Sequence, residues 1–428
     1  MRAACAARRE QIIAGSHAPL KPDRSPFEAA VASGTMLAAL ASARRRMPHR
    51  RVLFSVGDDS GDLHAANLMR AMRQLEPEVR FAGFGMERMA EAGLEPLAAG
   101  GRAEGGGADS AMWLHNVLRA GQFRRRLVCC RDYLDSRPPD LVVPVDFGGF
   151  NLFLCREAAR RRIPVFYYIP PQVWAHGWYR LKKLRKWVTR CGLIYPFEEA
   201  LYRRYGVPAE YVGHPLFDEL KRSPPSARTV EALRGRFGDC LVGVFPGSRR
   251  QEVAAHLPVV LKSCRDIRRA VPHASFALLG GPKVGAFLRE LLGAGGSGLE
   301  LLEGVTPAEL AKASRLCITK SGTVTLEIAS QGTPMVIFYR ASPLVIFLAH
   351  GLADTPYMGL INNLAGRVVC PEKHMVRPCA GWVAEQAVRL LTDRGAYENC
   401  RQAIGRALAG FAEPGASARA AHSALSLI

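Results

Sequence analysis

The chain has 428 residues, a length that predicts two or three domains rather than one. Hydrophobic residues make up 48% of it and charged residues only 22%, which excludes a disordered protein. The net charge of +20 favours an anionic partner: a nucleic acid, an anionic membrane or a phosphorylated substrate. No stretch approaches the ~18 to 20 uninterrupted apolar residues of a membrane span, so we expect a soluble or peripheral protein.

The N-terminal segment is basic: the first fifty residues hold nine Lys/Arg against three Asp/Glu. Arg44, Arg45 and Arg46 follow its apolar run, whereas a signal peptide carries its charges before that run. We expect residues 1–48 to be a disordered extension, or the product of an over-long gene assignment with the true start at Met36 or Met47. An arm that tethers the chain to a membrane is the alternative interpretation.

The eleven cysteines are scattered, with one adjacent pair, Cys129 and Cys130, and no Cys-x-x-Cys motif. This pattern is typical of reduced thiols in a cytosolic protein rather than of disulfides or a zinc site. The chain also lacks an HExxH motif, a Walker lysine and an Asp-x-Asp pair. We therefore expect no metal and no cofactor.

Short apolar segments that predict strands alternate with helical segments along residues 51–195. The predicted strands are 51–56, 79–85, 141–145, 163–168 and 191–195, and the helices include 63–75 and 112–134. This alternation indicates a parallel, doubly wound sheet.

The pattern begins again after Val212–Pro215. The second set of predicted strands is 241–245, 275–279, 299–302, 316–319 and 335–338, with a helix from Glu252 after the first of them. We therefore predict an α/β protein of the GT-B arrangement, with two Rossmann-like domains, 49–215 and 216–385, that face each other across a cleft. Residues 386–428 are expected to form helices that pack back on the N-terminal domain.

In the first half, two loops follow predicted strands. Gly57 to Asp62 would form a tight turn whose amides face a ligand, although a helix N-cap by Asp59 or Ser60 explains the residues equally well. Asp146 follows the strand 141–145 directly, where a general base would face the crevice, and an Asx turn or a helix N-cap is the alternative.

In the second half, three segments are candidates for holding a nucleotide. Gly247, Ser248 and Arg249 would approach a diphosphate at the first strand–helix turn. Ser321, Gly322 and Thr323 would offer amides and hydroxyls at a later helix N-terminus, with Glu327 one turn beyond as an acceptor for ribose hydroxyls. Residues 357–367 form a polar loop with Asn362 and Arg367 beside the same cleft. Surface or capping roles remain the alternatives.

Taken in order, these motifs resemble the lipid-A-disaccharide synthases, the GT-B glycosyltransferase family 19, over most of residues 50–395. The matching segments are Val56–Asp62, Val145–Asn151, Tyr168–Trp174 (YIPPQVW), Tyr195–Glu199 (YPFEE), Gly206–Pro215 (GVPAEYVGHP), Phe245–Glu252 (FPGSRRQE), Ser321–Glu327 (SGTVTLE) and Asn362–Arg367 (NNLAGR). The resemblance implies an inverting transfer from UDP-2,3-diacylglucosamine to 2,3-diacylglucosamine 1-phosphate (lipid X), which yields the lipid A disaccharide 1-phosphate and UDP.

The resemblance also implies roles for residues and partners. Asp146 would be the base, Ser60, Gly61 and Asp62 would line the acceptor side, and Arg249, Ser321, Gly322, Thr323, Glu327 and Asn362 would hold UDP. Asp58 and Asn151 are further acceptor-side candidates, and Gly247, Ser248 and Arg367 further UDP-site candidates. The implied setting is the cytoplasmic face of a Gram-negative inner membrane, with a homodimer and no nucleic acid as partner.

Two basic helical regions carry apolar residues that suit insertion among anionic headgroups, with a solvated basic face as the alternative. They are Trp113, Leu114, Leu118 and Phe123 among Arg119 and Arg124–Arg126, and Leu181, Leu184 and Trp187 within Arg180–Arg190.

The sequence departs from the family pattern at four positions. Asp58 stands where Glu is usual, Gly149 where a second acidic residue is common, Ile361 where Pro is usual and Asn363 where an apolar residue is usual. Three rivals remain: another GT-B enzyme such as a UDP-sugar 2-epimerase or a peptidoglycan precursor transferase, an inactive membrane-associated relative, and a nucleic-acid binder. Asp146, Arg249 and Glu327 argue against the second, and the spread of the positive charge over several helices argues against the third.

Overall fold

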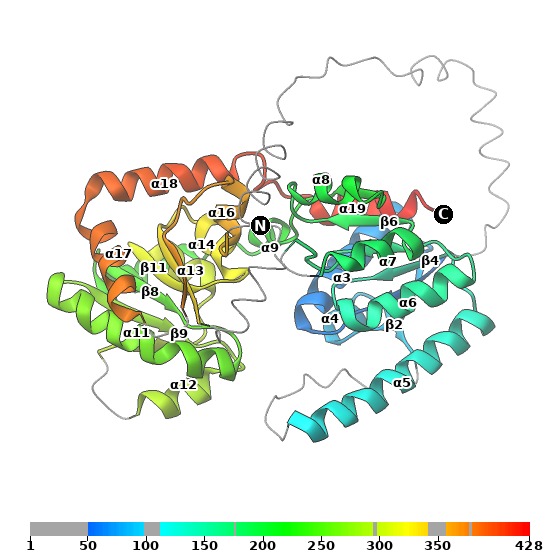
Figure 1. Cartoon of the computed structure of the whole chain (residues 1–428), viewed down its shortest axis with the longest axis horizontal. Helices are drawn as coiled ribbons and strands as arrows, with labels where there is room; N and C mark the ends of the chain where they lie inside the picture. Colours follow the sequence, from blue (N-terminus) through cyan, green and yellow to red (C-terminus); the bar gives the residue numbers. More distant parts are fainter. Residues whose placement is uncertain (1–49, 98–111, 175–176, 294–297, 341–356, 376–378) are drawn as a thin grey trace, which may run out of the picture. The chain divides into compact units, whose positions relative to one another are not determined.

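The structure is a computed structural model that describes residues 50–97, 112–174, 177–293, 298–340, 357–375 and 379–428. The predictions for residues 1–48 lie outside the described residues. Parallel β-strands occupy two parts of the chain, residues 51–211 and residues 241–375 (Figure 1).

The first half is built on strands in the order β3-β2-β1-β4. Isolated bridges from Val142 to Val165 and from Val145 to Tyr168 connect β4 to a further run, β5-β6-β7. The strands are β1 (Arg51–Ser55), β2 (Arg80–Phe84), β3 (Leu94–Pro96), β4 (Leu141–Pro144), β5 (Phe166–Tyr168), β6 (Arg190–Leu193) and β7 (Ala209–Tyr211). Side chains of β1 and β4 are buried on both faces, as expected for parallel strands covered on both sides.

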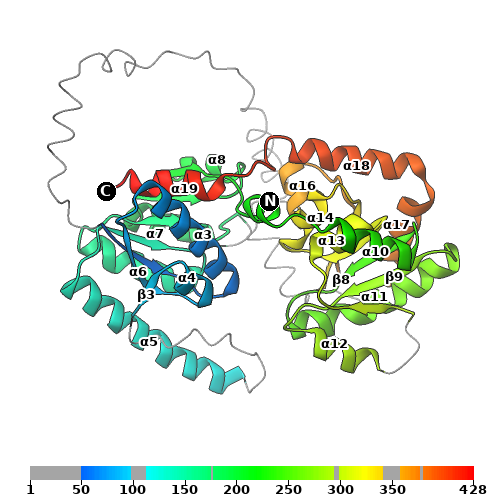
Figure 2. The ribbon, with the colours of Figure 1, turned by 180° about the vertical axis from the view of Figure 1, so that it is seen from behind.

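Helices cover this sheet in two groups. The helices are α3 (Asp59–Leu75), α4 (Glu87–Glu91), α5 (Met112–Ser136), α6 (Gly148–Arg160), α7 (Tyr179–Trp187) and α8 (Glu198–Arg204). Right-handed crossovers place α3 and α4 on one face and α5, α6 and α7 on the other. The observed packing of α3 on α4, of α5 on α6 and of α6 on α7 agrees with this (Figures 1 and 2).

The second half has one sheet in the order β10-β9-β8-β11-β12-β13. Its strands are β8 (Leu241–Phe245), β9 (Ser275–Leu279), β10 (Glu300–Leu302), β11 (Leu316–Lys320), β12 (Met335–Arg340) and β13 (Glu372–Met375). Its helices are α10 (Ala227–Phe237), α11 (Arg250–Ala270), α12 (Gly285–Leu292), α13 (Pro307–Ala313), α14 (Val324–Ser330), α16 (Leu360–Ala365), α17 (Ala380–Thr392) and α18 (Arg394–Leu408). The chain order reverses between β8 and β11, which is where open parallel sheets bind ligands.

Two predicted domain limits need correction. Helix α9 (Leu216–Arg222) packs against the C-terminal helix α19 (Ala416–Leu425), and its Glu219 accepts a hydrogen bond from Asn67 of α3, so the first half continues past Pro215. Helix α18 does not pack on the first half as expected: its buried residues face α14 and α16 of the second half. Helix α19 packs against α3.

Three short strands were not predicted, because the sequences Leu94–Pro96, Ala209–Tyr211 and Glu372–Met375 carry little apolar alternation. Among the helices of the described residues, none is long and apolar enough to cross a membrane.

Candidate active site

In the first half, the loops after β1 and β4 lie next to each other because these strands pair in parallel register, from Val52 with Leu141 to Ser55 with Pro144. The first loop is 56–58 and the second 145–147. A Cβ on Gly57 would overlap the ring of Phe147, so only glycine lets the two loops approach this closely. The structure thus brings Asp58 and Asp146 together.

Asp146 has an unusual backbone conformation. Its φ is +49° and that of Phe147 is +47°, two successive left-handed residues that are not glycine. Such strain costs of order 1 to 3 kcal/mol per residue and persists where the surroundings impose it. Here the Asp146 carbonyl accepts hydrogen bonds from Asn151 Nδ2 and from the Tyr167 hydroxyl, both at 2.8 Å, and its N–H donates to the Tyr168 carbonyl at 3.1 Å.

The side chain of Asn151 holds this loop in place through hydrogen bonds. It is fully buried, and its Nδ2 donates to the carbonyls of Ser55 and Val145 as well as Asp146, at 3.3, 3.2 and 2.8 Å. Its Oδ1 accepts from the Ser55 hydroxyl at 2.8 Å. Since these bonds occupy the amide completely, Asn151 positions Asp146 and does not itself line the acceptor side as predicted.

The Asp146 carboxylate is partly buried, and its environment favours the protonated form. Desolvation is the largest cause and the negative charge of Asp58 the second, and together they raise the Asp146 pKa to about 6 against the opposing effect of the Phe147 N–H. The helix N-cap interpretation of Asp146 is wrong, because Phe147 occupies the N-cap of α6 and makes no side-chain cap. A carboxylate that loses its proton near pH 6 suits a general base at neutral pH.

The loop after β1 is organised by its own carboxylates. Asp58, and not Asp59 or Ser60, is the N-cap of α3, where its Oδ1 accepts from Gly61 N–H at 2.8 Å. Asp62 is buried and accepts from the Met86 and Arg88 amides at 2.6 and 3.0 Å, so the prediction that it lines the acceptor side is wrong. Ser60 is exposed, with its hydroxyl 3.3 Å from His64 Nε2.

In the second half, the loops after β8 and β11 meet because these strands also pair in parallel. Glu252, in the first turn of α11, connects them: it accepts from Ser248 N–H at 3.2 Å and pairs with Lys320 Nζ at 3.2 Å. Burial by itself would raise the pKa of Glu252, but the positive charge of Lys320 outweighs it and holds that pKa below its ordinary value. A Cβ at Gly247, whose φ is +134°, would lie 2.8 Å from Glu252 Cβ.

The remaining predicted UDP-site residues of these loops are accessible. Arg249 precedes α11 with its side chain 80% exposed and only a 3.6 Å pairing with Glu252. Ser321 Oγ donates to the Met358 carbonyl at 2.7 Å, and Thr323 is exposed as the N-cap of α14 with no side-chain cap bond. Gly322 lies between them with a φ of +157°. The structure therefore groups these residues at the carboxyl-terminal ends of the central strands β8 and β11.

Glu327 lies in the first turn of α14 and is half-buried. Desolvation by burial raises its pKa to about 7. A carboxylate held in this way is a strong acceptor for a hydroxyl that replaces its lost water.

Asn362 was predicted on a polar loop as a UDP ligand, and both expectations are wrong. It lies in helix α16 and is fully buried. Its Nδ2 donates to the Cys370 carbonyl and to Glu372 Oε2, both at 2.8 Å, and its Oδ1 accepts from the Val369 and Cys370 amides at 2.8 and 2.9 Å. These hydrogen bonds fix the connection between α16 and β13. Arg367, just after α16, is exposed.

Sequence reasoning missed Glu252, Lys320 and Glu372 as organisers of this edge. Glu372 accepts from the Met358 and Gly359 amides at 3.0 and 2.7 Å, and so fixes the segment that Ser321 contacts. Glu252 and Lys320 stood inside or beside the matched motifs, so their position after a strand end was a usable signal. Glu372 follows no motif and could only be found from the fold.

The two basic helical regions differ from what was expected of them. Leu181 and Leu184 are fully buried, so these two residues belong to the core. Phe123 is half-buried and packs edge-on against Phe150 and Phe153. The side chains of Trp113, Leu114, Leu118 and Arg119 lie outside what the structure describes.

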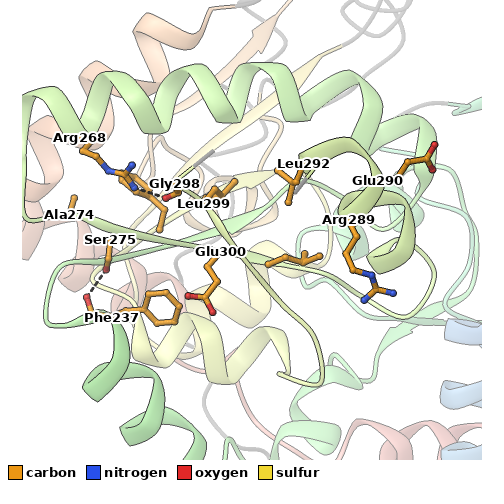
Figure 3. A pocket seen from close by; sticks show the side chains of 13 residues that line it. Phe237, Arg268, Ala274, Ser275, Arg289, Glu290, Leu292, Gly298, Leu299 and Glu300 are labelled. Atoms are coloured by element: carbon orange, nitrogen blue, oxygen red, sulfur yellow. Dashed lines mark hydrogen bonds between the residues drawn. The ribbon is translucent and has the colours of Figure 1, made fainter. Parts of the chain in front are cut away.

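A large open pocket on the second half contains none of the predicted site residues. Figure 3 shows it between β9, β10 and α12, with Arg268 donating to the Gly298 carbonyl and Ser275 to the Phe237 carbonyl. Its polar groups are thus largely paired within the chain, and it lies on strands away from the β8–β11 edge.

Two Rossmann-like halves, each with polar loops at the carboxyl ends of its strands, define a GT-B protein. A putative UDP-N-acetylglucosamine 2-epimerase from Listeria monocytogenes has this fold: 14% identity, TM-score 0.57, coverage 86% of this chain and 94% of that one. A UDP-GlcNAc 2-epimerase from Neisseria meningitidis, bound to UDP-GlcNAc, is similar with 13% identity, TM-score 0.55 and coverage of 83% and 97%. At these identities the likeness establishes the fold alone.

The sequence comparisons define the family. The model of the family described as lipid-A-disaccharide synthetase matches residues 52–408. A lipid-A-disaccharide synthase of Geobacter sulfurreducens is 35% identical over 88% of this chain and 97% of its own length, and one of Coxiella burnetii is 32% identical over 84% and 92%. The chain belongs to the lipid-A-disaccharide synthase family of glycosyltransferases, which act in lipid A biosynthesis, and the epimerase, inactive-relative and nucleic-acid alternatives are not favoured.

Proposed function

We propose that the chain transfers the acylated glucosamine of UDP-2,3-diacylglucosamine to the 6-hydroxyl of lipid X, with inversion at the anomeric carbon. The observation that carries this proposal is Asp146: a carboxylate with its pKa raised to about 6, held by strained backbone at the end of β4. Family membership suggests the substrates, and the position and raised pKa of Asp146 support its role as the base.

On the acceptor side, Asp146 takes the proton of the attacking hydroxyl as its oxygen bonds the sugar carbon. The carbon–oxygen bond to the diphosphate breaks in the same step, and UDP leaves with the electron pair. The negative charge of Asp58 helps to raise the pKa of Asp146. The higher pKa makes the Asp146 carboxylate a stronger base, although a smaller fraction of it is ionised at a given pH.

On the donor side, the grouping at the β8–β11 edge fits a nucleoside diphosphate. The exposed Arg249 offers a forked donor to phosphate oxygens, and the first turns of α11 and α14 offer amides. Glu327 would accept from ribose hydroxyls. Lys320, already paired with Glu252, would add positive charge near the leaving group.

We further propose that the reaction needs no metal or cofactor. The positive charge of Arg249 and Lys320 would take the place of a metal at the diphosphate. We propose as well that the chain acts as a peripheral protein at the cytoplasmic face of the inner membrane, where both acylated substrates would reside, and that it forms a homodimer.

A transfer assay tests the proposed reaction directly. Purified protein in mild detergent is given UDP-2,3-diacylglucosamine, radiolabelled lipid X and EDTA. The proposal predicts a labelled disaccharide 1-phosphate in the presence of the chelator. Failure to form product while UDP still binds would contradict the acceptor assignment, and product that appears only without EDTA would contradict metal independence.

A further inference from the structure

A second pocket lies on the first half, on the face opposite α3, where α6 packs against α7. Its volume is about 240 Å³. Since a water occupies ~30 Å³, the pocket has room for a phosphate and part of a sugar or acyl chain, but not for a whole glycolipid. None of the candidate active-site residues lines it.

The spacing of residues on the two helices builds this pocket. From α6 come Gly149, Phe153 and Arg156, and from α7 come Tyr179, Lys183 and Trp187, each set about one turn apart on one side of its helix. Arg180 completes the wall, while the intervening Leu181 and Leu184 point into the core. Tyr179 and Phe153 remain 52% and 45% exposed, so their apolar surface faces the opening.

The pocket is strongly positive. Arg156, Arg180 and Lys183 line it, no acidic residue does, and none of the three has a carboxylate partner within the described part of the chain. The nearest acid on α6, Glu157, is already paired with Arg131, Arg160 and Arg161. Three unpaired cations beside aromatic rings are arranged for an anion that carries an apolar group.

The pocket adjoins the loop of the base. Gly148 and Gly149, which line it, are the second and third residues after Asp146, and a Cβ at Gly148 would lie 3.9 Å from Arg180 Nη1. No atom lies within 4 Å of the position that a Cβ of Gly149 would occupy, so a ligand could approach the pocket from this side. An acceptor whose hydroxyl meets Asp146 would thus have its more distant groups near Arg180 and Lys183.

We infer that the α6–α7 pocket holds the phosphate of the acceptor glycolipid on Arg156, Arg180 and Lys183, with the start of an acyl chain against Phe153, Tyr179 and Trp187. This inference rests on the proposed function and assigns the acceptor's anionic end to named residues. It makes these cations specificity determinants that favour a phosphorylated acceptor over the same sugar without phosphate.

The test compares acceptors with and without the phosphate, in neutral detergent that contains no anionic lipid. The variant Arg180→Gln/Lys183→Gln removes two of the cations, and Lys182→Gln/Lys186→Gln removes the same charge from exposed positions of the same helix outside the pocket. We expect the first variant to raise the KM for 2,3-diacylglucosamine 1-phosphate roughly 10- to 100-fold. Its KM for phosphate-free 2,3-diacylglucosamine and for the UDP-sugar should stay within about twofold, so that the preference for phosphate is lost.

Several results would overturn the inference. A similar rise in KM in the Lys182→Gln/Lys186→Gln control would indicate general electrostatic attraction, and an equal rise for both acceptors would indicate a structural role. An effect confined to binding of phosphatidylglycerol vesicles, with KM unchanged in neutral detergent, would assign the cations to membrane headgroups instead.

If the wild-type chain transferred sugar to neither acceptor, the proposed function would fail, yet the pocket could still be tested. Equilibrium binding of radiolabelled 2,3-diacylglucosamine 1-phosphate in the same micelles needs no turnover. Weaker binding by Arg180→Gln/Lys183→Gln, but not by Lys182→Gln/Lys186→Gln, would support the pocket as the phosphate site. Equal binding by the wild type and both variants would contradict it.

Discussion

Single carboxylates in this chain acquire distinct roles from their surroundings. Asp58 caps helix α3, and Asp62 accepts hydrogen bonds from two backbone amides. Asp146 is desolvated and lies near the negative charge of Asp58. Burial and the charge of Asp58 raise the pKa of Asp146 to about 6, the range of a base that works near neutrality. The division of labour follows from local geometry, because all three residues have the same side chain.

Removal of the charge at Asp58 should move the acid limb of the pH profile. Because Asp58 raises the Asp146 pKa, Asp58→Asn should lower that pKa, and kcat/KM should persist to lower pH than the wild-type fall near pH 6. Desolvation is the larger cause and remains, so the shift should be partial. Glu87→Gln, on the exposed side of α4, is the matched control and should leave the profile in place.

Glu327 should make donor affinity depend on pH. With its pKa near 7, it loses its negative charge as the pH falls, and the hydrogen bond to a ribose hydroxyl weakens. The KM for the UDP-sugar should therefore rise below pH 7 in the wild type, whereas Glu327→Gln should show a raised KM that no longer changes between pH 6 and 8. The same pH dependence in Glu327→Gln would remove the assignment, and Glu231→Gln, exposed on α10, serves as control.

At the scale of elements, both candidate sites depend on buried asparagines that fasten a loop to a strand end. Asn151 fixes the β4–α6 loop and Asn362 fixes the α16–β13 connection, each through several hydrogen bonds inside the protein. Such residues contact no substrate, but they set the geometry of those that do.

Asn362→Leu should destabilise the second half. The substitution leaves the Val369 and Cys370 amides and the Glu372 carboxylate without this partner in a buried place, at a cost of about 2 to 5 kcal/mol. Urea unfolding should show the loss, and the KM for the UDP-sugar should rise as the segment that contacts Ser321 loosens. Gln402→Leu on the exposed face of α18 should change neither, and an equally stable Asn362→Leu protein would contradict the bracing role.

The sequence predicted the strands and the loops that matter, but not how each polar residue is used. Positions after apolar strands located Asp146 and Ser321 correctly on strand ends, because parallel strands impose that geometry. Asn151, Asp62 and Asn362 were predicted as site-lining residues because they lie in matched motifs. Only the three-dimensional structure reveals that their side chains are occupied by hydrogen bonds to backbone groups of neighbouring loops. Short strands such as β13 were not predicted because neighbouring strands, rather than their own composition, stabilise them.

At the scale of the whole molecule, the chain passes between its halves twice, after α9 and again between α18 and α19. Asp218 of α9 anchors the returning segment, since its carboxylate accepts from the amides of Gly415, Ala416 and Ser417 at the start of α19. Arg190 reaches the other end of α19 through the Ser423 carbonyl at 3.2 Å. The C-terminal helix is in this way part of the first half.

Asp218→Ala should weaken that attachment. Loss of a carboxylate that caps a helix costs about 1 to 2 kcal/mol, so the Tm should fall by a few degrees. Asp239→Ala, at an exposed turn before β8, should leave the Tm within about one degree. Equal Tm values for the two variants would indicate that α19 is held by its apolar packing on α3 alone.

Asp146→Asn is the most direct test of Asp146 as the base of the sugar transfer. The amide has nearly the same shape but cannot take a proton, so the transfer rate at pH 7.5 should fall roughly 10²- to 10⁴-fold. UDP binding, which depends on the second half, should be unchanged, and the acid limb near pH 6 should vanish from the residual activity. Near wild-type turnover by Asp146→Asn, with the acid limb intact, would contradict the assignment of Asp146 as the base.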